Sequence, residues 1–172
     1  MKERIRIGGI KLSGNLTLTV LSESRTNPVL YPGFRLALAE NQINMTMLAF
    51  FRKEDGVKIS FTTASEDAPR VEALAKSFKG LHPEFFHDKT TISIFPAKSG
   101  ADILGRALWS LGQAGVEIRA ISSSLSTLTF VIDLARQDLA VRTLTSVFDI
   151  PSYHAPFTPE IQVRQSTIVG KE

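Results

Sequence analysis

The chain has 172 residues, 43% of them hydrophobic and 22% charged, with a formal net charge of +3. No stretch approaches the roughly 18 to 20 apolar residues of a membrane span, and Lys and Arg are scattered among Asp and Glu. We therefore expect neither a membrane nor a nucleic acid as partner. The chain lacks cysteine, which excludes disulfides and thiolate chemistry, and it opens without an apolar stretch long enough for a secretory signal. We expect a cytoplasmic protein.

The first half of the chain predicts the order strand, helix, strand, strand, helix. Apolar residues and threonine alternate over residues 16–21, which is typical of a strand with one buried face. Asn27 and Pro28 are typical of a helix start, but Pro32 would then fall beyond the first turn, so this helix is either irregular or begins at Pro32. A hairpin and a second helix complete the half: strands at 43–51 and 57–63, and a helix at 68–78 that Asp67 is placed to cap.

The second half repeats this order. We expect a strand at 91–95, a helix at 101–114, strands at 116–123 and 127–133, and a helix at 137–148. Gly115 stands where a helix would end in the left-handed conformation. Residues 4–12 and 160–169 are extended segments outside the repeat, and we expect them to supply the edge or fourth strands of the two sheets.

The apolar positions of the two halves match, which indicates duplication of one small domain. Leu18 and Val20 in the first strand match Ile92 and Ile94. The other matches follow the chain in the same order: Asn44 with Glu117, Ile59 and Phe61 with Phe130 and Ile132, and Val71, Leu74 and Phe78 with Val141, Leu144 and Phe148. We expect two domains of about 80 residues, at 1–86 and 87–172, with the strand at 160–169 able to pair with the first domain.

One face of the helix at 101–114 has a pattern that core packing does not explain. The buried stripe is predicted to contain five residues: Ile103, Leu104, Ala107, Leu108 and Leu111. Gly105, Trp109 and Gly112 lie on the opposite side, and Leu36 is the counterpart of Trp109 in the first half. An interior helix glycine costs about 1 kcal/mol relative to alanine, so two on one face suggest close approach of another element. We expect a helix-to-helix interface at these four positions, either between the two domains or between subunits.

No constellation typical of catalysis or of a standard metal site is present. His82, Glu84, His87 and Asp88 are close in sequence, but their spacing fits no standard ligand set, and we interpret them as solvated loop residues. Ser122, Ser123 and Ser124 have no base nearby in the sequence pattern. We therefore expect no enzymatic activity, no cofactor and no metal.

Two segments resemble ACT domains. They are Leu38–Asn44, with the sequence LAENQIN, and Leu111–Ser124, with the sequence LGQAGVEIRAISSS. The closest similarity is to the tandem pair at the regulatory end of aspartate kinases, without the kinase domain, and it spans nearly the whole chain. The resemblance implies an α+β fold of two ferredoxin-like βαββαβ modules packed side by side, with sheets that could be continuous and helices on one face. It also implies a non-catalytic regulatory protein that binds a small effector, typically an amino acid, at an interface between modules.

The resemblance also implies effector-binding positions, in the loop after the first strand and at the head of the second strand of each module. In the first module these are Arg25, Thr26, Asn27, Asn44 and Thr46, and in the second Ser99, Gly100, Ala101, Asp102 and Glu117. A helix N-terminus suits the carboxylate of an amino acid. Asp102 has a simpler interpretation as a residue that complements the helix dipole. The implied partners are an amino-acid effector, a second copy in a homodimer and a regulated enzyme of amino-acid metabolism.

Two other functions share this element order. An assembly module whose effector site no longer binds would fit the absence of the Arg-Pro-Gly typical of ACT helix starts. An RNA-binding βαββαβ module would need aromatic residues on the open sheet face. Phe61 and Phe130 keep step with core positions, so only Phe50 is expected to lie outward. The pattern therefore argues against RNA.

Overall fold

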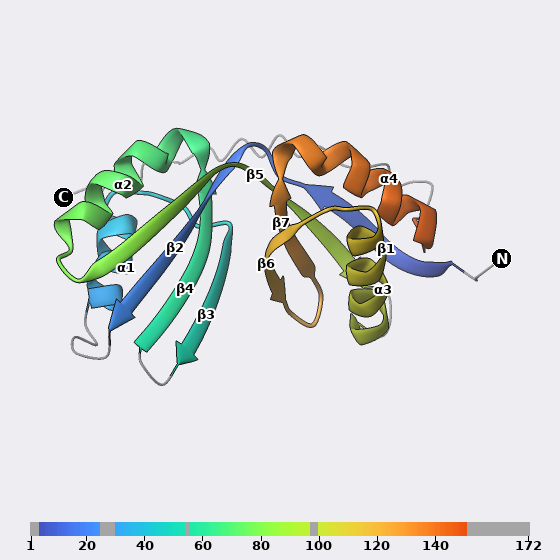
Figure 1. The fold of residues 1–172 in the computed structure, drawn as a ribbon, viewed down its shortest axis with the longest axis horizontal. Helices are drawn as coiled ribbons and strands as arrows, with labels where there is room; N and C mark the ends of the chain where they lie inside the picture. The colour runs from blue at the N-terminus through green and yellow to red at the C-terminus, as the bar shows by residue number, and fades with distance from the viewer. Residues whose placement is uncertain (1–3, 25–29, 54–55, 97–99, 151–172) are drawn as a thin grey trace, which may run out of the picture.

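The structure is a computed structural model, and it describes residues 4–24, 30–53, 56–96 and 100–150. Figure 1 shows two halves, each with a β-sheet and two helices, joined where two long strands cross at the top of the view. The predicted α+β class and the βαββαβ order of each half are confirmed. None of the helices in this described part is long and apolar enough to cross a membrane.

The first half has the strand order β3-β4-β2-β5. Its strands are β2 (Leu16–Ser24), β3 (Met47–Lys53), β4 (Gly56–Ala64) and the beginning of β5 (Leu81–Pro96). Its helices are α1 (Leu30–Glu40) and α2 (Ala68–Ser77), the latter preceded by a 3₁₀ turn at Ser65–Asp67. Pro32 lies in the first turn of α1, where its missing N–H is harmless. The helix therefore begins at Leu30, before Pro32.

The second half has the order β6-β7-β5-β1-β8. Its strands are β1 (Ile5–Leu12), the end of β5, β6 (Ile118–Ser123), β7 (Leu128–Asp133) and the short β8 (Phe148–Asp149). Its helices are α3 (Gly100–Gln113) and α4 (Gln137–Val147), the latter after a 3₁₀ turn at Leu134–Arg136.

The halves exchange strands, which corrects the predicted division of the chain. β1 and β2 run antiparallel along β5: Leu12 pairs with Ile92, and Leu16 pairs with Lys89. The beginning of β5 is therefore the fourth strand of the first half, and β1 takes the fourth place in the second half. The prediction that residues 1–86 form the first domain is wrong for β1, and the strand at 81–90 was missed. The candidate strand at 160–169 lies outside the described residues.

A bulge in β5 keeps all four helices on one face of the joined sheet. Asp88 has a φ of 53°, and the pairing with β2 shifts between Leu16 and Leu18. In a strand the side chains alternate between faces, so an extra residue reverses which positions point toward the helices. Leu81 packs against the helices before the bulge, and Ile92 does so after it. The predicted continuous sheet with helices on one face is confirmed.

Each half has its own apolar core between sheet and helices. The core of the first half is built from these residues: Leu21, Phe34, Leu38, Ile43, Ile59, Phe61, Val71, Ala75 and Leu81. The larger core of the second half contains Ile7 and Ile10 from β1 beside the residues of β5, β7, α3 and α4. The predicted stripe of α3 is correct for Ile103, Ala107 and Leu111, but Leu108 is exposed.

The repeat is confirmed with one change of register. Gln42 and Gly115 both adopt positive φ after a helix end, 56° and 69°, which supports the predicted match of the two segments that follow them. The predicted match of Leu18 with Ile92 in the first strand is wrong. Leu21 pairs with Ile59 as Ile92 pairs with Phe130, so Leu21 is the counterpart of Ile92. β2 is buried on both faces, so alternation could not distinguish Leu18 from Leu21.

Two further local predictions need correction. Asp67 occupies the helix N-cap position, but its side chain makes no capping hydrogen bond and instead pairs with Arg70 at 2.9 Å. The residues from His82 to Asp88 are not in a loop but in β5. Only one face of this strand meets the core, so the sequence contains a proline and charged residues that are typical of a loop.

Ser13 lies between β1 and β2 and connects this segment to β5 by hydrogen bonds. Its Oγ accepts a hydrogen bond from the backbone N–H of the buried Thr91 at 2.7 Å, and its backbone N–H donates to the Thr91 carbonyl at 3.1 Å. We predict that Ser13→Ala lowers the free energy of unfolding by about 1–3 kcal/mol, since a buried N–H loses its partner. Ser77→Ala is the control, because the Ser77 hydroxyl only bonds a carbonyl of its own helix at an exposed site. Equal denaturant midpoints for the two variants would contradict this assignment.

Candidate functional site

The predicted effector positions are spread over opposite ends of the helices. Arg25, Thr26, Asn27 and Ser99 lie outside the described residues. In the first half Asn44 and Thr46 are exposed between α1 and β3, and the Thr46 hydroxyl bonds the Thr62 hydroxyl at 2.8 Å. In the second half Gly100, Ala101 and Asp102 begin α3, whereas Glu117 follows its end.

In the second half the structure places the described positions at opposite ends of α3. At 1.5 Å per residue, the part of the helix from Asp102 to its end at Gln113 is about 16 Å long, and Glu117 follows that end. Asp102 is paired with Arg106 at 3.4 Å on its own helix, as expected for a residue that complements the helix start. An effector that contacts the start of a helix and the head of a strand would therefore need elements from two modules.

The open faces of the two sheet halves meet at a seam, and Glu117 lies beside it. Leu18, Val20 and Met47 of the first half form a small buried cluster with Val131 of the second half. Partly buried Phe86 and Ala120 pack against this cluster from β5 and β6. The seam is thus an apolar contact much smaller than either core.

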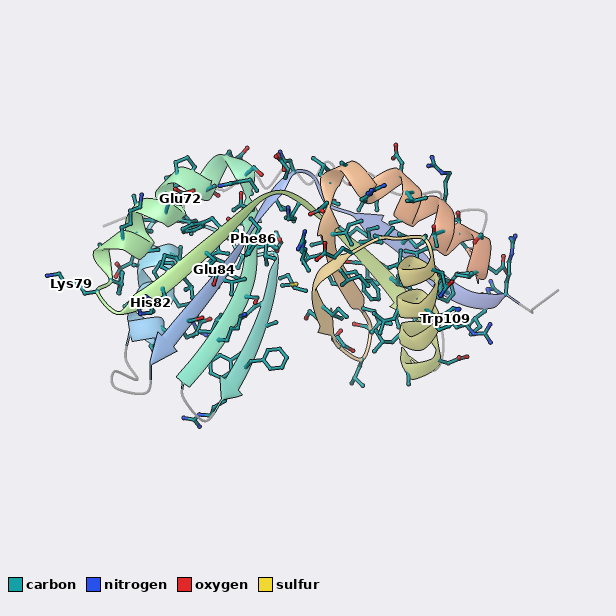
Figure 2. The ribbon with its side chains drawn as sticks, in the orientation of Figure 1. Glu72, Lys79, His82, Glu84, Phe86 and Trp109 are labelled. Carbon is teal, nitrogen blue, oxygen red and sulfur yellow. The ribbon has the colours of Figure 1, made fainter. Side chains whose placement is uncertain are left out.

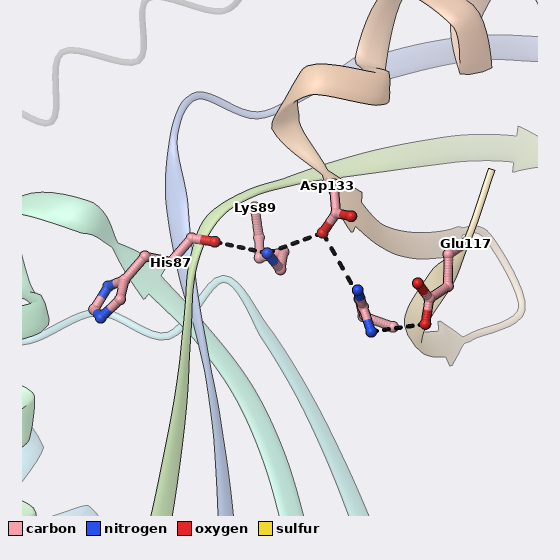
Figure 3. Close-up of polar contacts among 5 residues, drawn as sticks. His87, Lys89, Glu117 and Asp133 are labelled. Carbon is pink, nitrogen blue, oxygen red and sulfur yellow. Dashed lines mark hydrogen bonds and ion pairs between the residues drawn. The ribbon is translucent and has the colours of Figure 1, made fainter.

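A chain of charges runs from the bulge in β5 to this seam (Figure 3). Lys89 lies 2.9 Å from Asp133 Oδ1 and donates to the His87 carbonyl oxygen at 2.7 Å. Arg119 approaches the same Asp133 oxygen at 3.7 Å and donates to Glu117 at 2.7 Å. Two cations and two carboxylates, from β5, β7, β6 and the residue just before β6, therefore hold one another in place.

A pocket of about 220 Å³ lies in the seam, between the two halves. The first half contributes Leu18, Val20, Lys58, Glu84 and Phe86, and the second contributes Glu117, Ile118 and Arg119. Of the predicted effector positions that the structure describes, only Glu117 lines it. Lys58, Glu84 and Arg119 were missed, although Lys58 was identifiable as the polar neighbour of the buried Ile59 in an alternating strand.

The predicted interface residues lie on outward faces of the helices. Leu36 and Trp109 are 60% and 72% exposed, and an added Cβ at Gly105 or Gly112 would meet nothing within 4 Å. α1 and α3 lie in different halves and well apart in Figure 1, and Figure 2 shows Trp109 on α3. The prediction of a helix-to-helix interface between the two domains of one chain is therefore wrong.

Larger grooves lie beside the exposed faces of both α1 and α3. A groove of about 880 Å³ is lined by Ala101, Asp102, Gly105 and Trp109 together with residues of α4 and Arg4. A second, of about 500 Å³, lies between α1 and β3 beside Leu36 and Leu48.

The other predictions about chemistry can be compared with side-chain positions. Among the residues that the structure describes, no three His, Asp or Glu side chains could hold a metal ion together. Phe61 and Phe130 are fully buried in the cores, as predicted. Phe50 and Phe51 are both exposed, but the expectation that Phe50 lies on the open face is wrong. Phe50 pairs with the core residue Ile59 and its ring contacts Tyr31 of α1, so its neighbour Phe51 is the one on the open face of β3.

The charge chain predicts a pH dependence of stability. Hydrogen bonding from Lys89 lowers the pKa of Asp133 below 3.8, burial opposes this, and the charges of Lys89 and Arg119 add to the lowering. Because the folded pKa is depressed, the contribution is present above pH 4 and is lost as the pH falls through the folded value. We predict that Asp133→Asn reduces the free energy of unfolding at pH 7 and that the difference from wild type shrinks below pH 4. A difference that stays constant between pH 7 and pH 3 would contradict this.

Solved structures of aspartate kinase share this fold. The ligand-free regulatory subunit of aspartate kinase from Thermus thermophilus matches with a TM-score of 0.74 and 17% identity, over 83% of this chain and 99% of that one. The aspartate kinase from Synechocystis matches with a TM-score of 0.72 and 19% identity, over 86% of this chain and 27% of the enzyme. Aspartokinase III from E. coli, in complex with lysine and aspartate, matches with a TM-score of 0.62 and 14% identity, over 87% of this chain and 35% of that one.

No protein-family model and no curated protein matches the sequence. At identities as low as these, the structural likeness establishes the fold alone. The resemblance to the ACT pair is confirmed at this level, and the chain has the fold of an aspartate kinase regulatory subunit.

Proposed function

We propose that this chain is a non-catalytic regulatory protein that binds a small effector, an amino acid, at an interface between its ACT modules. The observation that carries the proposal is the likeness to a regulatory subunit of aspartate kinase, over 83% of this chain and 99% of that one. A structural relative, E. coli aspartokinase III, has been solved with lysine and aspartate bound.

The candidate effector contacts are the equivalent positions of the two modules. Of the described ones, Asn44 and Glu117 are exposed at the heads of the second strands, and Asp102 is exposed at the start of α3. Each is accessible to a ligand or to another module. The regulated enzyme of amino-acid metabolism and the cytoplasmic location stay predictions.

A second candidate function is assembly of subunits without an effector. It is favoured by the exposure of Trp109 and Leu36 at equivalent positions of α3 and α1, beside hollows on both helix faces. Large exposed aromatic side chains are enriched at protein interfaces. The two functions are compatible, since an effector site between modules can also lie between subunits.

Thermal unfolding with each standard amino acid tests effector binding. A ligand present at 100 times its dissociation constant adds about 2.7 kcal/mol to the folded state. We predict a raised midpoint with one or a few amino acids and none with the rest. If no amino acid raises the midpoint while sedimentation shows a stable dimer, the assembly function replaces the regulatory one.

Sedimentation of a Trp109 variant tests the subunit interface. We predict that Trp109→Asp shifts a homodimer toward the monomer, because a carboxylate would be desolvated where an aromatic side chain packed. Leu125→Asp is the control, since Leu125 is fully exposed in the turn between β6 and β7. Unaltered mass and stability in the Trp109 variant would exclude this residue from an interface.

A further inference from the structure

We propose that the seam pocket, of about 220 Å³, is itself an effector site, and that it takes the zwitterion of one amino acid with an apolar side chain. This rests on the proposed function and narrows it to an interface within a single chain. The pocket is smaller than the roughly 300–1,000 Å³ of sites for drug-sized ligands, so it suits a molecule the size of a single amino acid.

The charges of the pocket provide one partner for each end of a zwitterion. Arg119 is already held by Glu117 and Asp133. Among the side chains that the structure describes, neither Lys58 nor Glu84 has an ion-pair partner within 4 Å. Lys58 is therefore the partner for the carboxylate, and Glu84 is the partner for the ammonium group.

The register of the sheet separates these two charges by a suitable span. Val20 of β2 pairs with Ser60 of β4 on one side and with Glu84 of β5 on the other, and Lys58 lies two residues from Ser60 on the same face. Two strand spacings and the two-residue offset place the Cα atoms of Lys58 and Glu84 about 12 Å apart, which leaves room for one amino-acid backbone between the two long side chains. Figure 2 labels Glu84 on the beginning of β5.

The apolar part of the lining comes from the first half, through Leu18, Val20 and Phe86 on the open face of its sheet. The Ile118 side chain packs toward the core of the second half, so the second half contributes mainly the charged Glu117 and Arg119. An aliphatic side chain would bury apolar surface here at about 25 cal/mol per Å², whereas a second charged group would be desolvated. This selects valine, leucine or isoleucine over amino acids with charged side chains.

An occupant would connect the two halves through charges that already reach the bulge. Glu117 and Arg119 line the pocket, Arg119 contacts Asp133, and Asp133 contacts Lys89 next to the bulge at Asp88. Binding would thus fix the angle between the halves, because its contacts lie on both sides of the bend.

Calorimetric titration with L-valine, L-leucine and L-isoleucine tests the chemistry. At least one should bind, and L-valinamide, which lacks the carboxylate, and 3-methyl-2-oxobutanoate, which lacks the ammonium group, should bind much more weakly than L-valine. Lys58→Gln and Glu84→Gln should each weaken binding about tenfold or more, as expected for loss of a charged hydrogen bond. The matched controls Lys79→Gln and Glu66→Gln change exposed charges away from the pocket and should bind as wild type. Equal affinity of the pocket variants and controls would overturn the proposal.

Cysteine protection locates the site independently. The chain has no cysteine, so Phe86→Cys and Leu36→Cys each provide a single thiol, one in the pocket and one on the outer face of α1. Saturating L-valine, L-leucine or L-isoleucine should slow alkylation of the thiol at position 86 and leave that at position 36 unchanged.

The possible outcomes distinguish the seam site from the proposed regulatory function. Protection at position 36 alone, or binding only of amino acids outside the three probes, would overturn the seam site and leave the proposed function standing. No binding of any standard amino acid would overturn both.

Discussion

The antiparallel pairing of β1 and β2 with β5 is the constraint on which the rest of the structure depends. β5 completes the first half and begins the second, while β1 belongs to the second half and β2 to the first, so the sheet cannot be divided at one point of the chain. Small domains of about 80 residues bury little core, and sharing strands gives each half a sheet that it could not form alone. The hydrogen bonds between Ser13 and Thr91 lie where the halves join.

The bulge at Asp88 determines which face of the shared strand β5 meets the helices. It reverses the facing of side chains in β5, so that the helices of both halves cover the same face. The open faces are left to meet each other across a small apolar cluster. The contacts of Lys89, Asp133 and Arg119 lie on the open face of the second half, beside this cluster.

Two kinds of surface therefore remain available for function. The outer faces of α1 and α3 are exposed and carry Leu36 and Trp109, which suits contacts with another subunit. The inner seam combines charges of both signs with an apolar floor, which suits a small zwitterion. The two surfaces lie on different elements, since helices form the outer one and strands form the inner one.

The sequence by itself determined the duplication, the order of elements and most of each core, because strand and helix periodicities record which faces meet the interior. Phe61 and Phe130 and the outward position of Trp109 follow from that local pattern. Only the tertiary structure decided which strand completes which half, the register of β2, and the meeting of Lys58 and Glu84 with Glu117. These depend on pairing between segments far apart in the chain, and a strand buried on both faces, like β2, has no alternation that reveals its partners.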